Sequence, residues 1–89
     1  MDELSLHFVR DKEKREVDFL ICRKRKPEIL IECKLTKKEV SPHLAYFAER
    51  LGVKKTYQVI RHEIETELHL HGDSTIQMIS ASQFLKNLV

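Results

Sequence analysis

The feature that most constrains this chain is a pair of alternating stretches within residues 16–34, EVDFLICRKRKPEILIECK. Apolar and other side chains alternate with a period of two on each side of a basic segment, which is typical of two β-strands joined by a turn. The segment RKRKP at 23–27 predicts a hairpin loop of about five residues. The two stretches therefore predict an antiparallel hairpin.

The loop length sets which residues face each other across the hairpin. The expected pairs are Cys22 with Glu28, Leu20 with Leu30, Asp18 with Glu32, and Glu16 with Lys34. One face of the hairpin is then apolar and consists of Val17, Phe19, Ile21, Ile29, Ile31 and Cys33. The other face is also largely apolar, with Leu20, Cys22 and Leu30, as in a central hairpin covered on both sides.

The expected pair of Asp18 and Glu32 is the first candidate site. Like charges directly opposite on one sheet face destabilise the pair, whereas a divalent cation between them would stabilise it. Lys34 lies two residues beyond Glu32 and so projects on the same face. The alternative is that all three side chains lie at a solvated strand end; however, charges at the end of a buried hairpin require partners.

The remaining segments predict further elements in a simple order. Residues 4–10 read as a first strand, and a four-residue turn at 11–14 would pair Arg10 with Arg15 and His7 with Asp18. Ser41-Pro42 predicts a helix start and Gly52 its left-handed end. Strand, helix and the following strand at 56–60 imply a right-handed crossover and a parallel neighbour.

The last third of the chain is less regular. Residues 61–72 alternate in part and predict either an edge strand or an exposed excursion. His69 and His71 share a face there, but no third metal ligand is visible nearby, so a solvated edge is favoured over a zinc site. A last strand at 75–79 precedes a helix over 80–89. Ser80 and Gln83 can cap that helix, which is expected to bury Phe84, Leu85 and Leu88.

Composition bounds the class of protein. The 89 residues, 42% hydrophobic and 34% charged, predict one globular domain spanning 1–89. No apolar run approaches the roughly 18 residues of a membrane span, and the acidic N-terminus does not resemble a signal peptide. A cytoplasmic protein without a membrane partner is expected. Cys22 and Cys33, on opposite faces, are expected to remain reduced.

Basic side chains are clustered although the net charge is only +2. Candidate DNA-binding residues are Arg23, Lys24, Arg25 and Lys26 in the hairpin turn, with Lys37 and Lys38 before the helix. Such clusters are what binding to a phosphate backbone requires. The alternative is a solvated hairpin tip, since the turn lies about four residues, or ~13 Å, from Asp18.

Asp18 followed by Glu32-Cys33-Lys34 on the next strand resembles the D…(D/E)-x-K signature of the PD-(D/E)XK nuclease superfamily. The wider run, EVDF, IECK, a Ser-Pro helix and a further strand, is most similar to the domain of unknown function at the C-terminal end of many prokaryotic AAA+-type ATPases. The resemblance covers nearly the whole chain. It implies an α/β fold with a restriction-endonuclease-like mixed β-sheet, in the order βββαββα, lacking the usual N-terminal helix.

The resemblance also implies residue roles in a metal-dependent endonuclease that hydrolyses DNA phosphodiester bonds. Asp18 and Glu32 would hold Mg²⁺ or Mn²⁺, and the backbone carbonyl of Cys33 could add a ligand. Lys34 would orient the attacking water and stabilise charge on the phosphate. Glu16, beside Lys34, would tune it.

A second class of function stays open at this point. The chain could be a non-catalytic interaction module of a AAA+-type ATPase, in which the hairpin serves folding and docking. A sheet face without a covering N-terminal helix would also expose an apolar patch, which predicts a homodimer. The partners to be tested are therefore DNA, an ATPase domain and a second copy of the chain.

Overall fold

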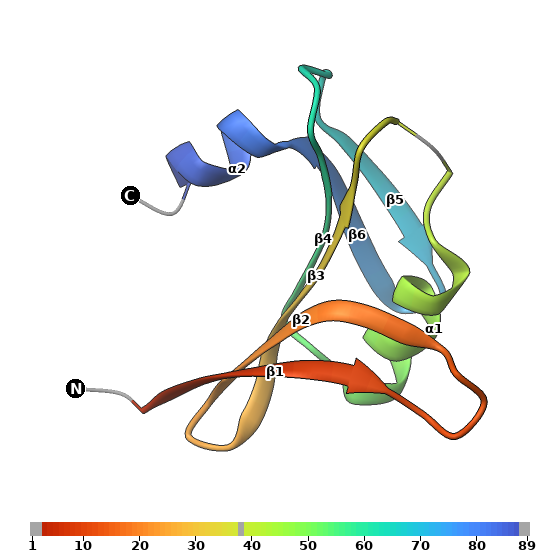
Figure 1. Ribbon diagram of the computed structural model, residues 1–89, viewed down its shortest axis with the longest axis vertical. Coiled ribbons are helices and arrows are strands. Elements are labelled where there is room, and N and C mark those ends of the chain that lie inside the picture. The colour runs from red at the N-terminus through yellow and green to blue at the C-terminus, as the bar shows by residue number, and fades with distance from the viewer. Residues whose placement is uncertain (1–2, 38, 88–89) are drawn as a thin grey trace.

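The computed structural model describes residues 3–37 and 39–87, and it shows a six-stranded mixed sheet with two helices (Figure 1). The strands are β1 (Leu4–Arg10), β2 (Glu16–Arg23), β3 (Lys26–Lys34), β4 (Lys55–Ile60), β5 (Glu67–His71) and β6 (Ser74–Ser80). The helices are α1 (Pro42–Leu51) and α2 (Ala81–Asn87). The strands lie in the order β1-β2-β3-β4-β6-β5. The expected α/β class is confirmed.

The observed sequence of elements contains one strand more than the expected βββαββα. The ambiguous segment forms β5, which pairs antiparallel with β6 at the edge of the sheet. Gly72 allows the tight turn between the two strands because its φ is +60°, a conformation that costs glycine little. Leu68 and Leu70 project from this edge and are largely exposed. The alternation in this segment was therefore that of an edge strand.

Helix α1 begins and ends where the sequence predicts. The Ser41 side chain caps it by accepting a hydrogen bond from the Leu44 amide, and Pro42 follows as the first helical residue. Gly52 ends the helix at φ +61°, and its amide donates to the carbonyl of Ala48. The crossover then brings β4 parallel to β3, as expected.

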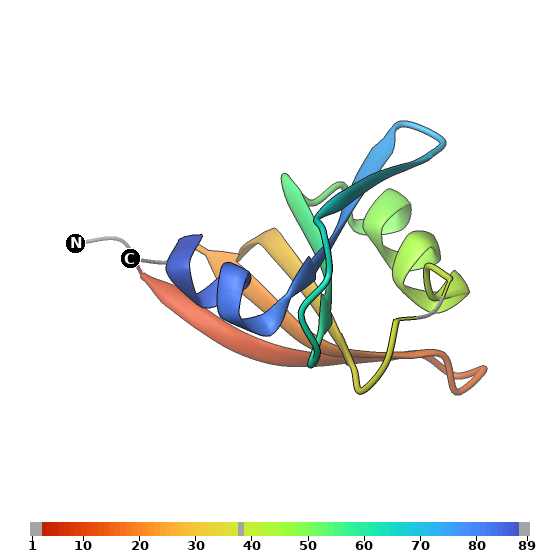
Figure 2. The same ribbon diagram turned by 90° about the horizontal axis from the view of Figure 1, so that it is seen from above.

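The two helices lie on opposite faces of the sheet (Figure 2). The face under α1 holds the larger core cluster, made of Val17, Leu20, Cys22, Leu30, Leu44, Phe47, Ala48 and Ile76. The opposite face holds Ile31, Val59 and Ile79, with Phe84 of α2 packed against them. The central strands are thus covered on both sides, which is why their sequences read as nearly continuous apolar runs.

The turn of the central hairpin is shorter than predicted. Only Lys24 and Arg25 connect β2 to β3, and both have positive φ, 52° and 68°. Two successive residues with positive φ match the twist of a two-residue hairpin turn, so the strands continue to the turn. Leu20 pairs with Leu30 as expected, but a register shift places Cys22 opposite Pro27 instead of Glu28.

The first hairpin also differs from its expected register. Arg10 pairs with Glu16 and not with Arg15, because the turn includes one more residue than predicted. The register shifts again between His7 and Val9, and this shift turns the neighbouring side chains of β2 to the other face of the sheet. As a result Val17 packs under α1, on the face opposite to the one predicted.

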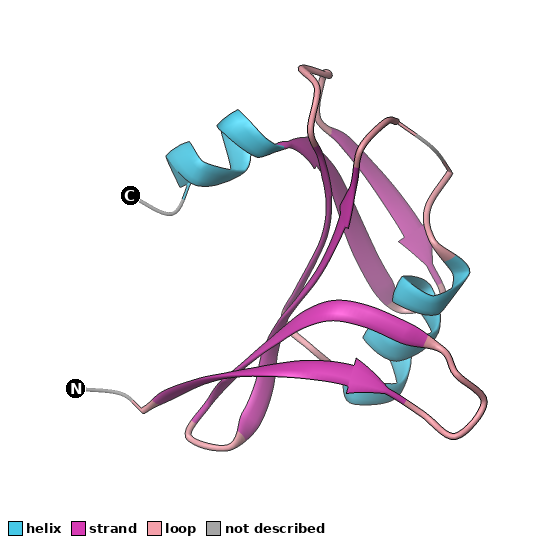
Figure 3. Ribbon diagram, in the orientation of Figure 1, coloured by secondary structure: helices cyan, strands magenta, loops and turns pink. Residues whose placement is uncertain are grey.

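At the start of α2, one of the two expected capping hydrogen bonds forms. The Gln83 amide donates to Ser80 Oγ at 3.2 Å, but the Gln83 side chain donates to Asn87 rather than reaching back. Phe84 packs edge-on against Tyr57 with ring centroids 5.0 Å apart. The expected burial of Leu85 is wrong, since it is 60% exposed, and Leu88 lies outside the described residues. Figure 3 shows α2 directly after β6 at the top of the view, with β1 at the bottom.

Two expectations from composition can be compared with the structure. Within residues 3–37 and 39–87, none of the helices has the length and apolar character needed to span a bilayer. Both cysteines are free, with Cys22 buried and Cys33 exposed. The predicted absence of a disulfide is therefore consistent with the geometry.

Candidate functional site

The two candidate carboxylates lie where the ladder between β2 and β3 stops. Its last pair is Phe19 with Ile31. One residue further, side chains replace the backbone bonds: the Asp18 amide donates to Glu32 Oε1 at 3.2 Å, and the Cys33 amide donates to Asp18 Oδ2 at 2.8 Å. Each carboxylate therefore crosses to the other strand, and the two side chains lie side by side.

A bulge explains why the ladder ends there. His7 pairs with Leu20 and Val9 with Val17, so Phe8 alone faces two residues of β2, Asp18 and Phe19. Bulges interrupt pairing and redirect side chains, often next to functional sites. The expected pairing of His7 with Asp18 is wrong because the longer turn and this bulge each shift the register by one residue. His7 pairs with Leu20, and its ring hydrogen-bonds with Ser5.

Of the two carboxylates, that of Glu32 has the more perturbed environment. Glu32 is only 7% exposed, whereas Asp18 is exposed. Burial raises the pKa of Glu32 above its ordinary value, and the neighbouring Asp18 carboxylate raises it further by repulsion. Lys34 opposes this shift only in part. A cation beside the pair would relieve the repulsion that burial strengthens.

Lys34 joins this pair as predicted. Its Nζ lies 3.8 Å from Glu32 Oε2, and both residues project on the same side of β3. Glu16, by contrast, forms an ion pair with Arg10 of β1 at 3.0 Å. The structure brings Asp18, Glu32 and Lys34 together, and it directs Glu16 toward the neighbouring edge strand.

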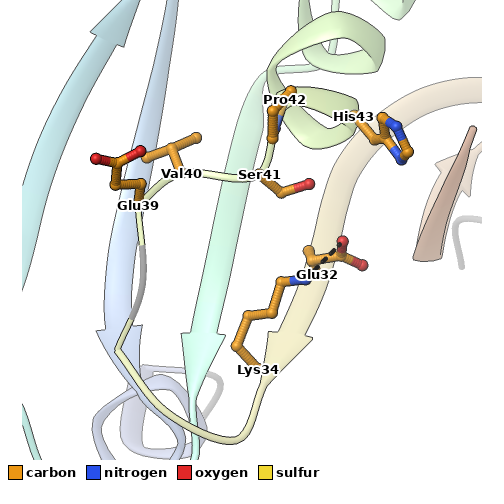
Figure 4. Close-up of a pocket in the computed structure, with 7 residues that line it drawn as sticks. All are labelled: Glu32, Lys34, Glu39, Val40, Ser41, Pro42 and His43. Atoms are coloured by element: carbon orange, nitrogen blue, oxygen red, sulfur yellow. Dashed lines mark ion pairs between the residues drawn. The ribbon is translucent and has the colours of Figure 1, made fainter.

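A cleft of about 500 Å³ opens beside Glu32 and Lys34. Its lining residues are Glu32, Lys34, Glu39, Val40, Ser41, Pro42 and His43 (Figure 4). The cleft lies between the carboxyl end of β3 and the first turn of α1. In open α/β sheets, ligands bind at this end of the strands.

His43 is a residue of this cleft that the sequence reasoning did not select. Figure 4 shows its ring on the wall facing the Glu32 carboxylate, with both groups directed toward the space between them. The signal was present in the sequence, since His43 follows the Ser41-Pro42 helix start. Linking that helix start to Glu32 requires knowledge of the crossover, which the sequence shows only as a connection.

Gln58 is a second residue that was missed, and it determines the shape of the cleft wall. It is fully buried on β4, directly opposite Glu32 of β3. Its Oε1 accepts from the Ser41 amide at 2.8 Å, and its Nε2 donates to the Glu39 carbonyl at 3.1 Å. One buried amide thus holds the entry to α1 against the sheet.

Cys33 lies between Glu32 and Lys34 in sequence and beside both acidic residues in space. Although the residue as a whole is exposed, partial desolvation of its sulfur raises the pKa of the thiol, and the charges of Asp18 and then Glu32 raise it further. The thiol is therefore a poor nucleophile at neutral pH. The role predicted for its backbone carbonyl as a metal ligand stays a prediction.

The part of the structure that is described contains no group of three or more His, Cys, Asp or Glu side chains arranged to hold a metal. A cation at Asp18 and Glu32 would have two protein carboxylates and would need water or backbone oxygens for its remaining ligands. Mg²⁺ is usually bound in this way, through one or two carboxylates with several retained waters. The donor set fits Mg²⁺ or Mn²⁺.

The candidate DNA-binding side chains are divided between two regions. Arg23, Lys24, Arg25 and Lys26 lie at the far end of the hairpin from Asp18. Arg23 and Lys54 flank Glu28 at 2.8 and 3.7 Å, and the hydrogen bond from Arg23 is the main cause that lowers the pKa of Glu28. Part of the basic charge at this end is thus neutralised within the chain.

The other candidate lysines lie in the connection after β3. Lys37 forms an ion pair with Glu67 of β5, and Lys38 lies outside the described residues. His69 Nε2 is 2.9 Å from the other oxygen of Glu67. Lys37 first and His69 second lower the pKa of Glu67. His69 therefore has a carboxylate neighbour on the edge strand, which accounts for it without a metal.

Comparisons with known proteins place most of the chain in one family. A family model described as "Domain of unknown function (DUF4143)" matches residues 2–84. A search of curated proteins and a search of solved structures each found no match.

Proposed function

The chain belongs to the DUF4143 family, whose description assigns no activity, and we propose from the geometry of the site that it is a metal-dependent nuclease-like domain. The proposal includes a restriction-endonuclease-like core. The observation that supports this proposal most is the exchange of carboxylates between β2 and β3. Asp18 and Glu32 replace the strand ladder there, and Lys34 lies beside them. A sheet stabilised by packing alone would not require two adjacent acidic groups at this point.

In the proposed site, Asp18 and Glu32 would hold one Mg²⁺ or Mn²⁺ ion. One oxygen of each carboxylate accepts a strand amide, and Glu32 Oε2 lies 3.8 Å from Lys34 Nζ. The two carboxylates would hold the ion, and Lys34 would lie beside it. When bound, the metal would supply Lewis acid activation of a phosphodiester and of a water molecule. The amide hydrogen bonds keep both side chains in position before the ion arrives.

Lys34 and His43 act on the substrate in this proposal. The Lys34 ammonium group would orient the attacking water and stabilise negative charge on the phosphate oxygens. His43, on the opposite wall of the cleft, can donate a hydrogen bond to a phosphate oxygen. Gln58 keeps the two walls at a constant separation because it joins β4 to the start of α1.

Thermal unfolding with and without metal tests the proposal. An ion that binds only the folded chain adds RT ln(1 + [L]/Kd), or about 2.7 kcal/mol at 100 times Kd. For a domain of this size that corresponds to a rise in Tm of roughly 10–20 °C. Asp18→Asn and Glu32→Gln should raise the Tm without metal, abolish the metal effect and abolish nicking of plasmid DNA.

Two further variants separate metal binding from catalysis. Lys34→Ala should retain the metal-induced rise in Tm and lose cleavage, since the ammonium group acts on water and phosphate. Glu65→Gln removes an exposed carboxylate outside the site and serves as the control. A wild-type Tm that does not respond to either metal, together with no nicking, would contradict the proposal.

DNA is the proposed substrate, and the basic residues provide a way to test it. Because each neutralised phosphate contributes to salt dependence, we expect duplex DNA binding to weaken steeply with salt. Lys24→Ala combined with Lys26→Ala should reduce the salt slope by about 2 if the hairpin turn contacts the phosphate backbone. An unchanged slope would restrict DNA contact to the cleft.

The alternative function is an interaction module of a AAA+-type ATPase, and one observation favours it. Large apolar side chains are exposed on both edge strands, at Leu4, Leu6 and Phe8 of β1 and at Leu68 and Leu70 of β5. A docking module would use such surfaces and would show no response to metal. The melting experiment therefore distinguishes the two functions.

A further inference from the structure

Strand β1 carries an apolar row on one side of an unpaired sheet edge. Leu4, Leu6 and Phe8 alternate along it and are 58%, 64% and 82% exposed. They lie on the face opposite to α1, because Leu6 pairs with Ile21 and Phe8 stacks on Phe19. Helix α2 covers the same face, but it packs chiefly on β4 and β6, and Figure 1 shows it well above β1.

The side chains of β1 lack the charges and prolines by which proteins often prevent edge-to-edge pairing. Protected edges carry lysines, prolines, inward-facing charges or bulges, or are kept short, and the one bulge in this strand pair places its extra residue on β2, not on the free strand β1. From Leu4 to Val9 the strand has no lysine, arginine, acidic residue or proline. The other edge, β5, is shorter and begins at Glu67, which is held in ion pairs.

We propose that β1 is a self-association surface, where two copies of this chain pair their β1 strands antiparallel about a two-fold axis at Leu6. In this arrangement Leu6 faces its symmetry mate and Leu4 faces Phe8 of the second copy. The two sheets become one continuous sheet of twelve strands. The main-chain donors and acceptors along both edges are then paired.

The second copy is the occupant that the sequence of β1 favours, because the strand is complementary to itself in this register. An interface about a two-fold axis uses the same patch on both subunits. With Leu6 on the axis, all three apolar residues meet apolar residues. On the opposite face Ser5 meets His7 of the second copy, a pairing of hydrogen-bonding groups.

The neighbouring registers that keep both sheet faces aligned are less favourable. A shift by two residues in one direction places Leu4 opposite Arg10 and brings Glu3 opposite Asp11, two like charges. A shift by two residues in the other direction leaves Phe8 without an apolar residue of the second copy opposite it. Only the register centred on Leu6 covers the full row.

The size of the row suits a weak, concentration-dependent dimer. With the half-buried Phe19 and Ile21 beside it, the row forms an apolar stripe on the order of a few hundred Å², the size at which exposed patches mark interaction sites. Stable complexes bury roughly 800 Å² per partner. The added strand pairing supplies further contact along the edge, so we expect dimers at hundreds of micromolar and dissociation on dilution.

Charge exchange at the axis tests both the surface and the register. Leu6→Lys and Leu6→Glu each place two like charges opposite one another, so each variant alone should have half the mass of the wild type by light scattering. An equimolar mixture of the two should recover the dimer, because opposite charges then face each other. Both substitutions are at an exposed side chain, and circular dichroism should show that the fold is unchanged.

Leu68→Lys is the matched control, since Leu68 is 69% exposed on the opposite edge strand. This variant should remain dimeric. The proposal is overturned if the wild type is monomeric at hundreds of micromolar, if Leu68→Lys dissociates it as effectively as Leu6→Lys, or if the mixture of lysine and glutamate variants stays monomeric.

Discussion

Replacing Gln58 by leucine removes the two hydrogen bonds that hold the start of α1 while keeping most of the side-chain volume. The Ser41 amide is buried and would lose its acceptor, whereas the Glu39 carbonyl belongs to an exposed residue and can bind water. An unsatisfied buried donor costs about 1–3 kcal/mol and a replaced hydrogen bond about 0.5–1.5 kcal/mol. The expected loss is therefore about 2–4 kcal/mol.

That loss is a large part of the free energy of unfolding, which is about 5–15 kcal/mol for a typical domain. It corresponds to a decrease in Tm of roughly 10–30 °C for a chain of this length. Thermal unfolding followed by circular dichroism measures it. Gln77→Leu is the matched control, because Gln77 is a half-buried glutamine on β6 whose side chain makes no hydrogen bond within residues 3–37 and 39–87.

Gln58→Glu adds a pH-dependent version of the same test. The introduced carboxyl can accept from the Ser41 amide, but only its protonated form can donate to the Glu39 carbonyl. Burial raises the pKa of such a group, so this variant should be most stable at acidic pH and lose stability as pH rises. A Gln58→Leu variant that melts within a few degrees of Gln77→Leu would refute the proposed role of this amide.

Three further outcomes are expected. Because the pKa of Glu32 is raised in the folded chain, the metal-free chain should lose stability as pH rises above 4.5, the ordinary pKa of this group. Glu32→Gln should remove this loss, as urea titrations at several pH values would show. Gly72→Ala should destabilise the fold chiefly because a φ of +60° strains a residue that carries a Cβ. The new Cβ would also lie 2.8 Å from Glu49 Oε1, but that exposed side chain can move, so thermal unfolding should show that adding Glu49→Ala recovers only a small part of the loss. Leu44→Ala should cost about 2.7–5.0 kcal/mol in chemical denaturation, since Leu44 is fully buried on the face of α1 that packs on the sheet, and a smaller cost would indicate that the core collapses into the gap.

The sequence alone was sufficient for the elements whose signals are local. The bounds of β1, the Ser41 cap of α1, its end at Gly52 and the parallel crossover to β4 follow from alternation, capping and loop length. These features depend on a few neighbouring residues. The same holds for the spacing of Glu32 and Lys34, because two residues apart on a strand always share a face.

Only the tertiary structure decided how the strands are aligned. The central turn is two residues long because Lys24 and Arg25 both adopt positive φ, a conformation that their side chains do not predict. A single bulge at Asp18 and Phe19 moved Val17 to the other face. One residue of shift reverses every later side chain, and alternation itself cannot reveal where a shift occurs.

Which residues meet at the cleft likewise depended in part on the tertiary structure. Asp18 and Glu32 could be paired from the sequence because one hairpin connects them. His43 reaches the cleft from a helix, and Gln58, on the strand beyond the crossover, positions two lining residues through its hydrogen bonds to Ser41 and Glu39. Their neighbours depend on how α1 packs on the sheet, which is set by the buried contacts of Leu44, Phe47 and Ala48 rather than by any pattern around the polar residues themselves.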